Sequence, residues 1–192
     1  MERPAYTRVA LTGTPGTGKS TVGRLLQRNP AMVKMGFHVT EVSDLAVRSG
    51  GGRPIPGPRP TVEVDLDQLS RWLGAEGAGE PPLLIVGHLA HLLPVEASVL
   101  LRCDPVILEQ RLQARGDPVV TVQQNVESEM VDVILAEAVG AGYPLFEHDT
   151  TRETPSMTAQ WVLSVIEGKV APSHGEIDWL AHFVGEPARE GS

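Results

Sequence analysis

Residues 13–21 read Gly-Thr-Pro-Gly-Thr-Gly-Lys-Ser-Thr and fit the pattern G-x-x-x-x-G-K-[ST]. The apolar run 9–11 precedes this stretch, and apolar residues at helical spacing follow it to about Arg28. The order predicts a strand, a glycine loop and a helix. In such a loop the backbone N–H groups turn inward around phosphate oxygens, and the positive end of the helix dipole points at them. The stretch therefore predicts a phosphate-binding loop in an α/β fold.

Lys19 and Ser20, at the end of this loop, have separate chemical tasks. Lys19 would neutralise the terminal phosphates of a nucleotide. Ser20 would ligate Mg²⁺ through its hydroxyl, because Mg²⁺ takes hard oxygen ligands. A glycine-rich turn that matches the pattern by chance is the alternative, and the flanking strand and helix favour the phosphate loop.

The composition limits the classes of function. The 192 residues suit one domain with a full hydrophobic core. Acidic residues number 24 against 16 basic ones, and the net charge of -8 disfavours a broad nucleic-acid-binding or anionic-membrane-binding surface. Cys103 is the only cysteine, which excludes an internal disulfide and a cysteine-built metal site. The sequence shows neither a signal-peptide pattern nor a membrane-spanning run, so we expect a cytoplasmic protein.

Strands and helices alternate along the chain, which predicts a parallel α/β sandwich. After the first strand, further strands are predicted near 37–41, 83–86, 99–101 and 145–148. Asn29-Pro30 should end the first helix, and Ser43 or Asp44 can cap a short second one. Further helices are predicted at 65–74, at 104–115, as one helix from about 123 to 140, and at 154–168.

Other segments are predicted to be irregular. Residues 49–60 contain Gly-Gly-Gly and several prolines, and they are expected to form an exposed loop. Residues 116–122 should interrupt the helices on either side. The tail from Lys169 is rich in proline, glycine and charge, except at 177–184. There Trp179, Leu180 and Phe183 could dock on the body of the protein.

A set of motifs together resembles one family of P-loop kinases. The matching stretches are 11–21, Val-Ser-Asp-Leu-Ala at 42–46, 64–67, 86–94 with its Gly-His-Leu-Ala-His-Leu-Leu-Pro segment, 108–116, 125–127 and Asp-Thr-Thr at 149–151. They are similar to adenylate kinase isoenzyme 6, an archaeal and eukaryotic enzyme also implicated as an ATPase in small-ribosomal-subunit maturation. The resemblance implies a P-loop NTPase three-layer sandwich with a five-stranded parallel sheet. It implies a kinase domain at 1–170, with a nucleoside-monophosphate-binding region at 41–64 and a lid at 114–124, followed by a tail at 171–192.

The resemblance also assigns residues to the site. ATP would be held by Gly13, Gly16, Thr17, Gly18, Lys19, Ser20, Thr21 and Arg115. Arg111 and Arg115 would stabilise the charge of the transferring phosphoryl group, and a solvated helix face is the alternative for Arg111. His88 would have a catalytic role, against the alternative of a packed or loop histidine. Asp44 would lie near a metal-bound water, and it can cap its helix as well.

The chain departs from the family pattern at several positions. Val86 stands where the family usually has Asp or Glu. The carboxylate that contacts the Mg²⁺-bound water in the family is therefore missing at this position. We expect Asp44 to replace that carboxylate. In the lid, Asp117 and Thr121 stand where the family has an aromatic residue and a lysine.

The leading hypothesis is an Mg²⁺-dependent nucleoside-monophosphate kinase that converts ATP and AMP into two ADP. The resemblance also implies intrinsic ATPase activity and a role in small-ribosomal-subunit and rRNA maturation. The partner in that role would be a small-subunit ribosomal protein. The AMP phosphate would need arginine near the helix that follows the second strand, and Arg48 is the candidate with Arg53 behind it. An assembly-switch ATPase with little kinase activity and a P-loop kinase for another small metabolite stay open as alternatives.

Overall fold

The computed structural model describes residues 4–56, 61–76 and 81–184. Within these ranges the main sheet has five strands in the order β2-β5-β1-β6-β7. The strands are β1 (Arg8–Thr12), β2 (His38–Glu41), β5 (Leu83–Val86), β6 (Ala97–Arg102) and β7 (Leu145–Asp149). Every neighbouring pair is parallel, so all the strands end at the same edge of the sheet. The predicted α/β class with a five-stranded parallel sheet is confirmed.

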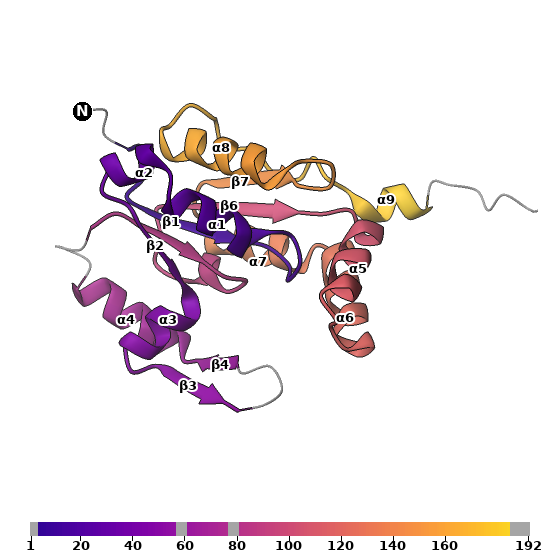
Figure 1. Cartoon of the computed structure of the whole chain (residues 1–192), viewed down its shortest axis with the longest axis horizontal. Helices are drawn as coiled ribbons and strands as arrows, with labels where there is room; N and C mark the ends of the chain where they lie inside the picture. The colour runs from indigo at the N-terminus through magenta and orange to yellow at the C-terminus, as the bar shows by residue number, and fades with distance from the viewer. Residues whose placement is uncertain (1–3, 57–60, 77–80, 185–192) are drawn as a thin grey trace, which may run out of the picture.

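Helices cover both faces of this sheet (Figure 1). On one face lie α1 (Lys19–Gln27), α2 (Pro30–Lys34) and α8 (Pro155–Ile166), and on the other lie α3 (Val42–Arg48), α4 (Leu66–Glu76), the short 3₁₀ helix η1 (Ala90–Leu92) and α7 (Val133–Ala141). Leu84 of β5 packs into the first layer and Ile85 into the second. Burial on both faces explains why the strand reads as one continuous apolar run.

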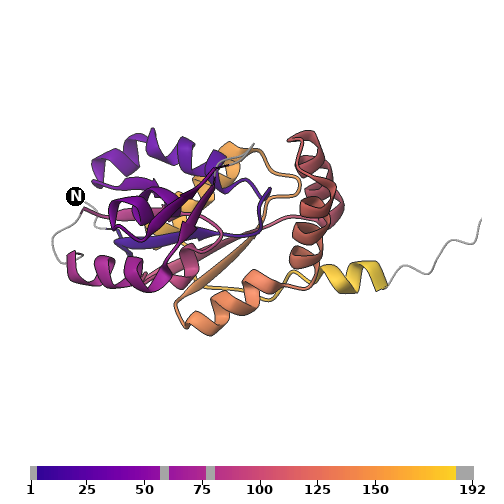
Figure 2. The same ribbon diagram turned by 90° about the horizontal axis from the view of Figure 1, so that it is seen from below.

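Two more helices stand at the carboxyl edge of the sheet. These helices, α5 (Pro105–Ala114) and α6 (Val119–Met130), lie side by side in both ribbon views (Figures 1 and 2). Leu108 and Leu112 of α5 pack with Val122 of α6 in one buried cluster. Ligands of open α/β sheets bind at this edge, so it is where a site is expected. In the part of the chain that the structure describes, no helix is both long and apolar enough to cross a membrane.

The segment predicted as an irregular loop at 49–60 is partly regular. Strands β3 (Gly52–Ile55) and β4 (Thr61–Val64) pair antiparallel, and residues 57–60 lie outside the described residues. Pro54 is tolerated because a two-stranded ribbon leaves each strand with a free edge, where a missing N–H costs little. The alternation of polar and apolar residues in β4, Thr-Val-Glu-Val, was the available sequence signal. The prediction of an irregular loop is therefore wrong for residues 52–55.

The prediction of one helix from 123 to 140 is also wrong. Helix α6 begins at Val119, inside the segment predicted as a break, and ends at Met130, whereas α7 begins at Val133. Between them Asp132 has a φ of 57°, a left-handed conformation that residues other than glycine adopt rarely. The carboxylate of Asp132 accepts a hydrogen bond from Arg102 in this position. A contact between side chains distant in the sequence thus stabilises the break between α6 and α7. The spacing of apolar residues carries no information about such a contact.

Two helix starts differ from prediction. Asn29 accepts a hydrogen bond from the backbone N–H of Ala31 (2.8 Å), so it starts α2 as well as ending the preceding helix. Helix α3 has Glu41 as its N-cap, without a side-chain capping bond. The predicted cap by Ser43 or Asp44 is therefore wrong. Asp44 lies in the first turn of α3, where a negative charge favours the helix dipole.

The segment after α8 packs along the edge of the sheet and ends in α9 (Trp179–Val184). The backbone N–H of Glu147 on β7 donates to the carbonyl of Ser173 (2.9 Å), and the N–H of Gly175 donates to the Glu147 carboxylate (2.7 Å). Trp179 is buried, as predicted, whereas Leu180 is 43% exposed. The Phe183 side chain lies outside the described residues. Docking of the tail is confirmed for Trp179 and wrong for Leu180.

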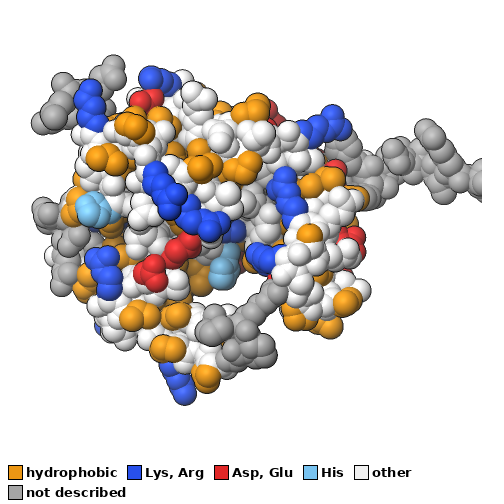
Figure 3. Space-filling model, in the orientation of Figure 1, with side chains coloured by type: hydrophobic (Ala, Val, Ile, Leu, Met, Phe, Trp, Pro, Cys, Tyr) orange, Lys and Arg blue, Asp and Glu red, His pale blue; other side chains and the backbone are white. Residues whose placement is uncertain are grey.

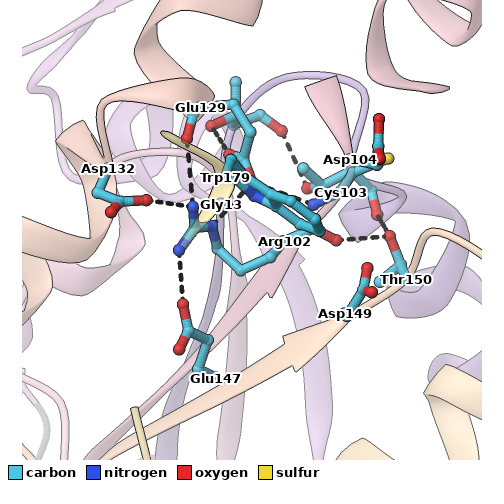
Figure 4. Close-up of polar contacts among 12 residues, drawn as sticks. Gly13, Arg102, Cys103, Asp104, Glu129, Asp132, Glu147, Asp149, Thr150 and Trp179 are labelled. Atoms are coloured by element: carbon cyan, nitrogen blue, oxygen red, sulfur yellow. Dashed lines mark hydrogen bonds and ion pairs between the residues drawn. The ribbon is translucent and has the colours of Figure 1, made fainter. Parts of the chain in front are cut away.

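A buried ionic network joins this tail to the sheet (Figure 4). The guanidinium of Arg102, only 1% exposed, binds the carboxylates of Glu129 (2.8 Å), Glu147 (2.5 Å) and Asp132. Desolvation alone would lower the pKa of Arg102, but these carboxylates outweigh it and raise the pKa. The Trp179 indole donates to Glu129 (3.3 Å), with its ring centroid 6.0 Å from the guanidinium carbon. The network fixes β6, β7, α6 and α9 to one another.

Glu129→Ala is predicted to lower the free energy of unfolding by about 3–5 kcal/mol, because it leaves the buried charge of Arg102 poorly compensated. Urea denaturation measures this loss. Glu127→Ala, at an exposed position of the same helix, is the matched control and should stay within about 0.5 kcal/mol of the unmodified chain. A loss below about 1 kcal/mol for Glu129→Ala, the size of an exposed ion pair, would contradict the buried network.

Candidate active site

The phosphate-binding loop between β1 and α1 requires glycine at several positions. Gly13 has a φ of +137°, and a Cβ there would lie 2.3 Å from the carbonyl oxygen of Leu101 on β6. Gly16 has a φ of +100°, and a Cβ there would lie 2.7 Å from the side chain of Leu108 on α5. Backbone conformation and lack of space both exclude larger residues. The loop is therefore packed closely between the end of β6 and α5.

Lys19 is buried beneath this loop. Its Nζ donates to the carbonyl oxygens of Gly13 (2.6 Å) and Thr14 (2.9 Å). Burial lowers the pKa of Lys19 to about 8, while the negative charges of Glu129 and Glu41 oppose the shift. A bound phosphate would favour the charged ammonium that burial disfavours. The position suits the predicted role of Lys19 in neutralising phosphate.

Threonine hydroxyl groups form hydrogen bonds within the loop and between the loop and the rest of the protein. Thr17 Oγ1 donates to the carbonyl of Thr14 (2.9 Å), and Thr150 Oγ1, just after β7, donates to the carbonyl of Thr17 (3.1 Å). Thr14 Oγ1 donates to the buried carboxylate of Glu129 on α6. Sequence reasoning missed Thr14 and Glu129 as a pair, because 115 positions separate them and no local pattern links them.

A cavity of about 510 Å³, named here the cationic cavity, opens beside the loop at the carboxyl edge of the sheet. Its lining residues are Pro15, Gly16, Gly18, Lys19, Ser20, Thr21, Arg24, Glu41, Gly87, His88, Arg111 and Arg115. Basic, acidic and histidine side chains accordingly gather at the centre of the face in Figure 3. Basic side chains outnumber acidic ones in this lining, so the cavity attracts anions.

Another cavity, of about 350 Å³, lies on the other flank of the loop and is named the flanking cavity. Its lining residues are Gly16, Thr17, Gly18, Thr21, Val22, Arg111, Thr150, Glu153, Pro155 and Thr158. It shares Gly16, Gly18, Thr21 and Arg111 with the cationic cavity, so the two adjoin. Its lining combines apolar side chains with carboxylate and hydroxyl groups.

Arg111 on α5 and Arg115, its C-cap residue, both face the cationic cavity, as their spacing of four predicts. Arg111 is half-buried and donates to the carbonyl oxygen of Thr150 (2.8 Å), so a purely solvated helix face is excluded for it. Arg115 is more exposed and forms an ion pair with Asp117 in the turn after α5. One arginine is thus fixed to the end of β7, and the other belongs to the turn that precedes α6.

The carboxylate that faces the cationic cavity is Glu41 rather than the predicted Asp44. Glu41 ends β2 and lines the cavity together with Ser20. Burial raises the pKa of Glu41, while the nearby Ser20 hydroxyl and the charge of Lys19 oppose the shift. Asp44 lies three residues later on α3, is exposed, and is not among the lining residues. The position of Glu41 at the carboxyl end of a predicted strand was the signal that could have identified it.

His88 and His91 have different environments. His88 follows β5 and lines the cationic cavity, where desolvation and then the charge of Lys19 lower its pKa, so its imidazole is neutral at pH 7. His91 is buried, with Nδ1 2.9 Å from Thr12 Oγ1 and Nε2 3.2 Å from the Glu137 carboxylate. Within the described ranges, no group of three or more His, Cys, Asp or Glu side chains is arranged to hold a metal ion.

Other arginines lie differently from expectation. Arg24 of α1 lines the cationic cavity and donates to the carbonyl of Ser20 (3.1 Å). Sequence reasoning missed Arg24, although its spacing of four from Ser20 places it one helical turn away on the same face. Arg48 and Arg53 line neither the cationic nor the flanking cavity. The Arg48 guanidinium instead lies 5.6 Å from the ring centroid of Trp72 on α4.

Comparisons with known proteins point to one family. A family model described as "AAA domain" matches residues 9–132. A protein of Pyrococcus abyssi named "Putative adenylate kinase" is 36% identical, over 89% of this chain and 90% of its own. Proteins with the same name from Natronomonas pharaonis and Halobacterium salinarum are 37% and 38% identical, over 92% and 90% of this chain and 99% and 97% of theirs.

Solved structures share the fold at lower identity. A shikimate kinase from Acinetobacter baumannii in complex with shikimate has a TM-score of 0.50 at 15% identity, over 84% of this chain and 93% of its own. A gluconokinase from Sinorhizobium meliloti 1021 has a TM-score of 0.51 at 21% identity, over 85% of this chain and 93% of its own. At such identities the likeness shows the fold alone.

Lys19→Ala is predicted to abolish turnover of ATP, because it removes the charge beneath the phosphate-binding loop. ADP formation from ATP and Mg²⁺ measures this, and calorimetric titration with ATP should show weaker binding. Lys34→Ala, at the exposed end of α2, is the control and should leave both measurements unchanged. Unchanged turnover in Lys19→Ala would remove the loop from the mechanism.

Arg115→Ala is predicted to reduce the rate of phosphoryl transfer by about 10³-fold if its guanidinium contacts the transferring group, as arginine fingers do. A single-turnover experiment with saturating enzyme isolates this step from product release. Arg28→Ala, at the exposed C-cap of α1, serves as the control. If Arg115→Ala keeps nearly the rate of the unmodified chain, Arg115 is a surface residue of the turn after α5.

Proposed function

The chain belongs to the AAA-domain family and to the adenylate kinase-like family of these archaeal relatives, and on that basis we propose that it is a nucleoside-monophosphate kinase converting ATP and AMP into two ADP. One observation carries the proposal. Basic side chains from α1 and α5 converge on one cavity beside a phosphate-binding loop. That cavity also adjoins the flanking cavity, which suits the rest of a nucleotide.

The reaction requires little covalent chemistry from the protein. An oxygen of the AMP phosphate forms a bond to the γ-phosphorus of ATP, the bond from that phosphorus to the bridging oxygen breaks, and ADP leaves. The attacking phosphate is largely ionised at pH 7, so the step needs no general base. Lys19, Arg111 and Arg115 would hold the reacting groups in line and stabilise the charge on the transferring oxygens.

The oxygen donors beside Lys19 fit an Mg²⁺ ion that arrives with ATP. Mg²⁺ usually binds one or two protein oxygens together with substrate phosphates, and here the Ser20 hydroxyl and the Glu41 carboxylate line the same cavity. The ion would neutralise part of the charge on the β- and γ-phosphates. Ser20 would be its protein ligand, as the sequence predicts.

We assign the nucleoside part of ATP to the flanking cavity. Val22 and Pro155 offer apolar contacts there, while Glu153 and Thr158 offer hydrogen-bonding groups. The Thr158 hydroxyl donates to the Glu153 carboxylate (3.0 Å), so these groups are positioned by one another. The loop residues shared by both cavities would then contact the phosphates that connect the nucleoside in the flanking cavity to the reacting phosphate in the cationic cavity.

The acceptor would enter from the opposite side of the cationic cavity. We propose residues 41–64, with the β3–β4 hairpin, as the nucleoside-monophosphate-binding region, and residues 114–124 as the lid, within a kinase domain at 1–170. Arg115 lies in the lid and reaches the cavity, so lid movement would bring its charge to the phosphates. Arg24 faces this cavity and is our candidate for the acceptor phosphate in place of Arg48 and Arg53, which line neither cavity.

A nucleotide-hydrolysing assembly switch is the second candidate. The lid carries the Arg115–Asp117 ion pair at an open cavity, and incomplete exclusion of water turns a kinase toward hydrolysis. In this case ATP hydrolysis would drive association with a partner, a small-subunit ribosomal protein by the resemblance of the sequence, and transfer to AMP would be incidental. A kinase acting on another small metabolite makes a third candidate.

Acceptor dependence separates these functions. We expect ATP and Mg²⁺ to yield ADP at roughly 1–100 s⁻¹ when AMP is added, a typical kinase rate, and far more slowly without it. Each nucleoside monophosphate is supplied separately, and nucleotides are quantified by anion-exchange chromatography. Lys19→Ala is the control for a contaminating kinase.

Other outcomes of this assay select the alternatives. ADP formation that is equally fast with and without AMP would support the hydrolytic switch and contradict the proposed kinase. No activity with any monophosphate, together with tight ATP binding, would point to a different acceptor.

A further inference from the structure

We propose that Glu41, at the end of β2, is the carboxylate that orients the water shell of the Mg²⁺ ion bound with ATP. The inference rests on the proposed use of MgATP, and it assigns a positioning residue to that same site. It places the acid on a different strand from the one that P-loop proteins ordinarily use, where an Asp at the end of the Walker-B strand accompanies the loop Ser or Thr.

The strand next to β1 offers no such acid. β5 pairs with β1 and ends at Val86, which is 1% exposed and has no oxygen in its side chain. One methyl group of Val86 would lie 3.0 Å from a Cβ built at Gly23, so the valine fills the space against α1. An apolar side chain in this place cannot accept hydrogen bonds from metal-bound water.

Glu41 stands directly beside that position on the neighbouring strand. In the parallel register of β2 and β5, Glu41 pairs with Val86. The Glu41 side chain lines the cationic cavity together with Ser20 and Lys19. An acid at the end of β2 therefore lies at the carboxyl edge of the sheet and at the same cavity as one at the end of β5 would.

The contacts of Glu41 are those that the role requires. The Glu41 side chain shares the cavity lining with Ser20, the predicted metal ligand, and with Arg24. Burial raises the pKa of Glu41, while the charges of Lys19 and Arg24 oppose the shift. A carboxylate next to a ligand hydroxyl can accept from the waters that complete the octahedral shell of Mg²⁺. Such a carboxylate orients the water molecules around the ion without binding the ion directly.

Competing roles for Glu41 are less well supported. Glu41 is the N-cap residue of α3, but its side chain makes no capping hydrogen bond, so the carboxylate is not used to start the helix. Asp44, the acid that the sequence favoured, is exposed and does not line the cavity. A purely electrostatic role as a counter-charge to Lys19 is the remaining competitor, and metal binding measured apart from nucleotide binding separates the two roles.

The test measures metal binding rather than turnover. Mn²⁺ replaces Mg²⁺, and electron paramagnetic resonance counts the free ion in titrations of the protein–ADP complex. Glu41→Gln is expected to weaken Mn²⁺ binding by about 10–100-fold, the usual cost of losing an outer-shell partner. Calorimetric titration with ADP in EDTA should give the same affinity for Glu41→Gln and the unmodified chain.

Asp44→Asn is the matched control, because it removes a carboxylate three residues away on the same segment. It should bind Mn²⁺ and ADP like the unmodified chain. Glu41→Asp keeps a shorter carboxylate and should give an Mn²⁺ affinity between those of the unmodified chain and Glu41→Gln. This variant also keeps the proposal testable if Glu41→Gln does not fold, as thermal unfolding would show.

Several outcomes would overturn the proposal. Unchanged Mn²⁺ affinity in Glu41→Gln would do so, and so would the same loss in Asp44→Asn alone. Altered ADP affinity in EDTA for Glu41→Gln, without a further effect of Mn²⁺, would make Glu41 an electrostatic partner of Lys19. Since ADP and Mn²⁺ involve no acceptor, the result stands apart from whether AMP receives the phosphoryl group.

Discussion

The carboxylate of Glu129 connects the phosphate-binding loop to the rest of the protein. It accepts hydrogen bonds from Thr14 in the loop, from the Arg102 side chain and the Cys103 backbone at the end of β6, and from the Trp179 indole. Glu129 is 2% exposed, so each of these contacts operates away from water, where an uncompensated charge is costly. The position of the loop therefore depends on α6 and α9, which are remote from it in the sequence.

This arrangement has consequences for the chemistry of the site. Lys19 is buried beneath the loop, where desolvation lowers its pKa and the charges of Glu129 and Glu41 limit the shift. With a pKa of about 8, Lys19 is mostly protonated at pH 7 and can bind phosphate. Its ammonium group donates hydrogen bonds to backbone carbonyl oxygens. Arg111 is fixed by Thr150, and Arg115 belongs to the turn that leads into α6. Movement of α6 would accordingly reach both the loop, through Glu129, and Arg115 in the preceding turn.

Sequence reasoning identified what local patterns encode. The glycine loop, the buried strands and the Arg-x-x-x-Arg spacing on α5 each follow from a few neighbouring residues, and they gave the sheet, the loop and the arginines at the cavity. It failed where distant contacts decide the structure. The left-handed Asp132 is held by Arg102, and Glu41 reaches the site because β2 lies beside β5 in the sheet. The β3–β4 hairpin was missed because its prolines and glycines outweighed a short alternating pattern.

We propose that the cationic cavity moves a phosphoryl group between nucleotides rather than to water. The most direct measurement follows the label from ATP radiolabelled at the γ-phosphate, in a single turnover with Mg²⁺ and AMP. The label should appear in ADP, with little released as inorganic phosphate, because Lys19, Arg111 and Arg115 would hold donor and acceptor phosphates together. Label released mainly as inorganic phosphate, at a rate that AMP does not change, would contradict it.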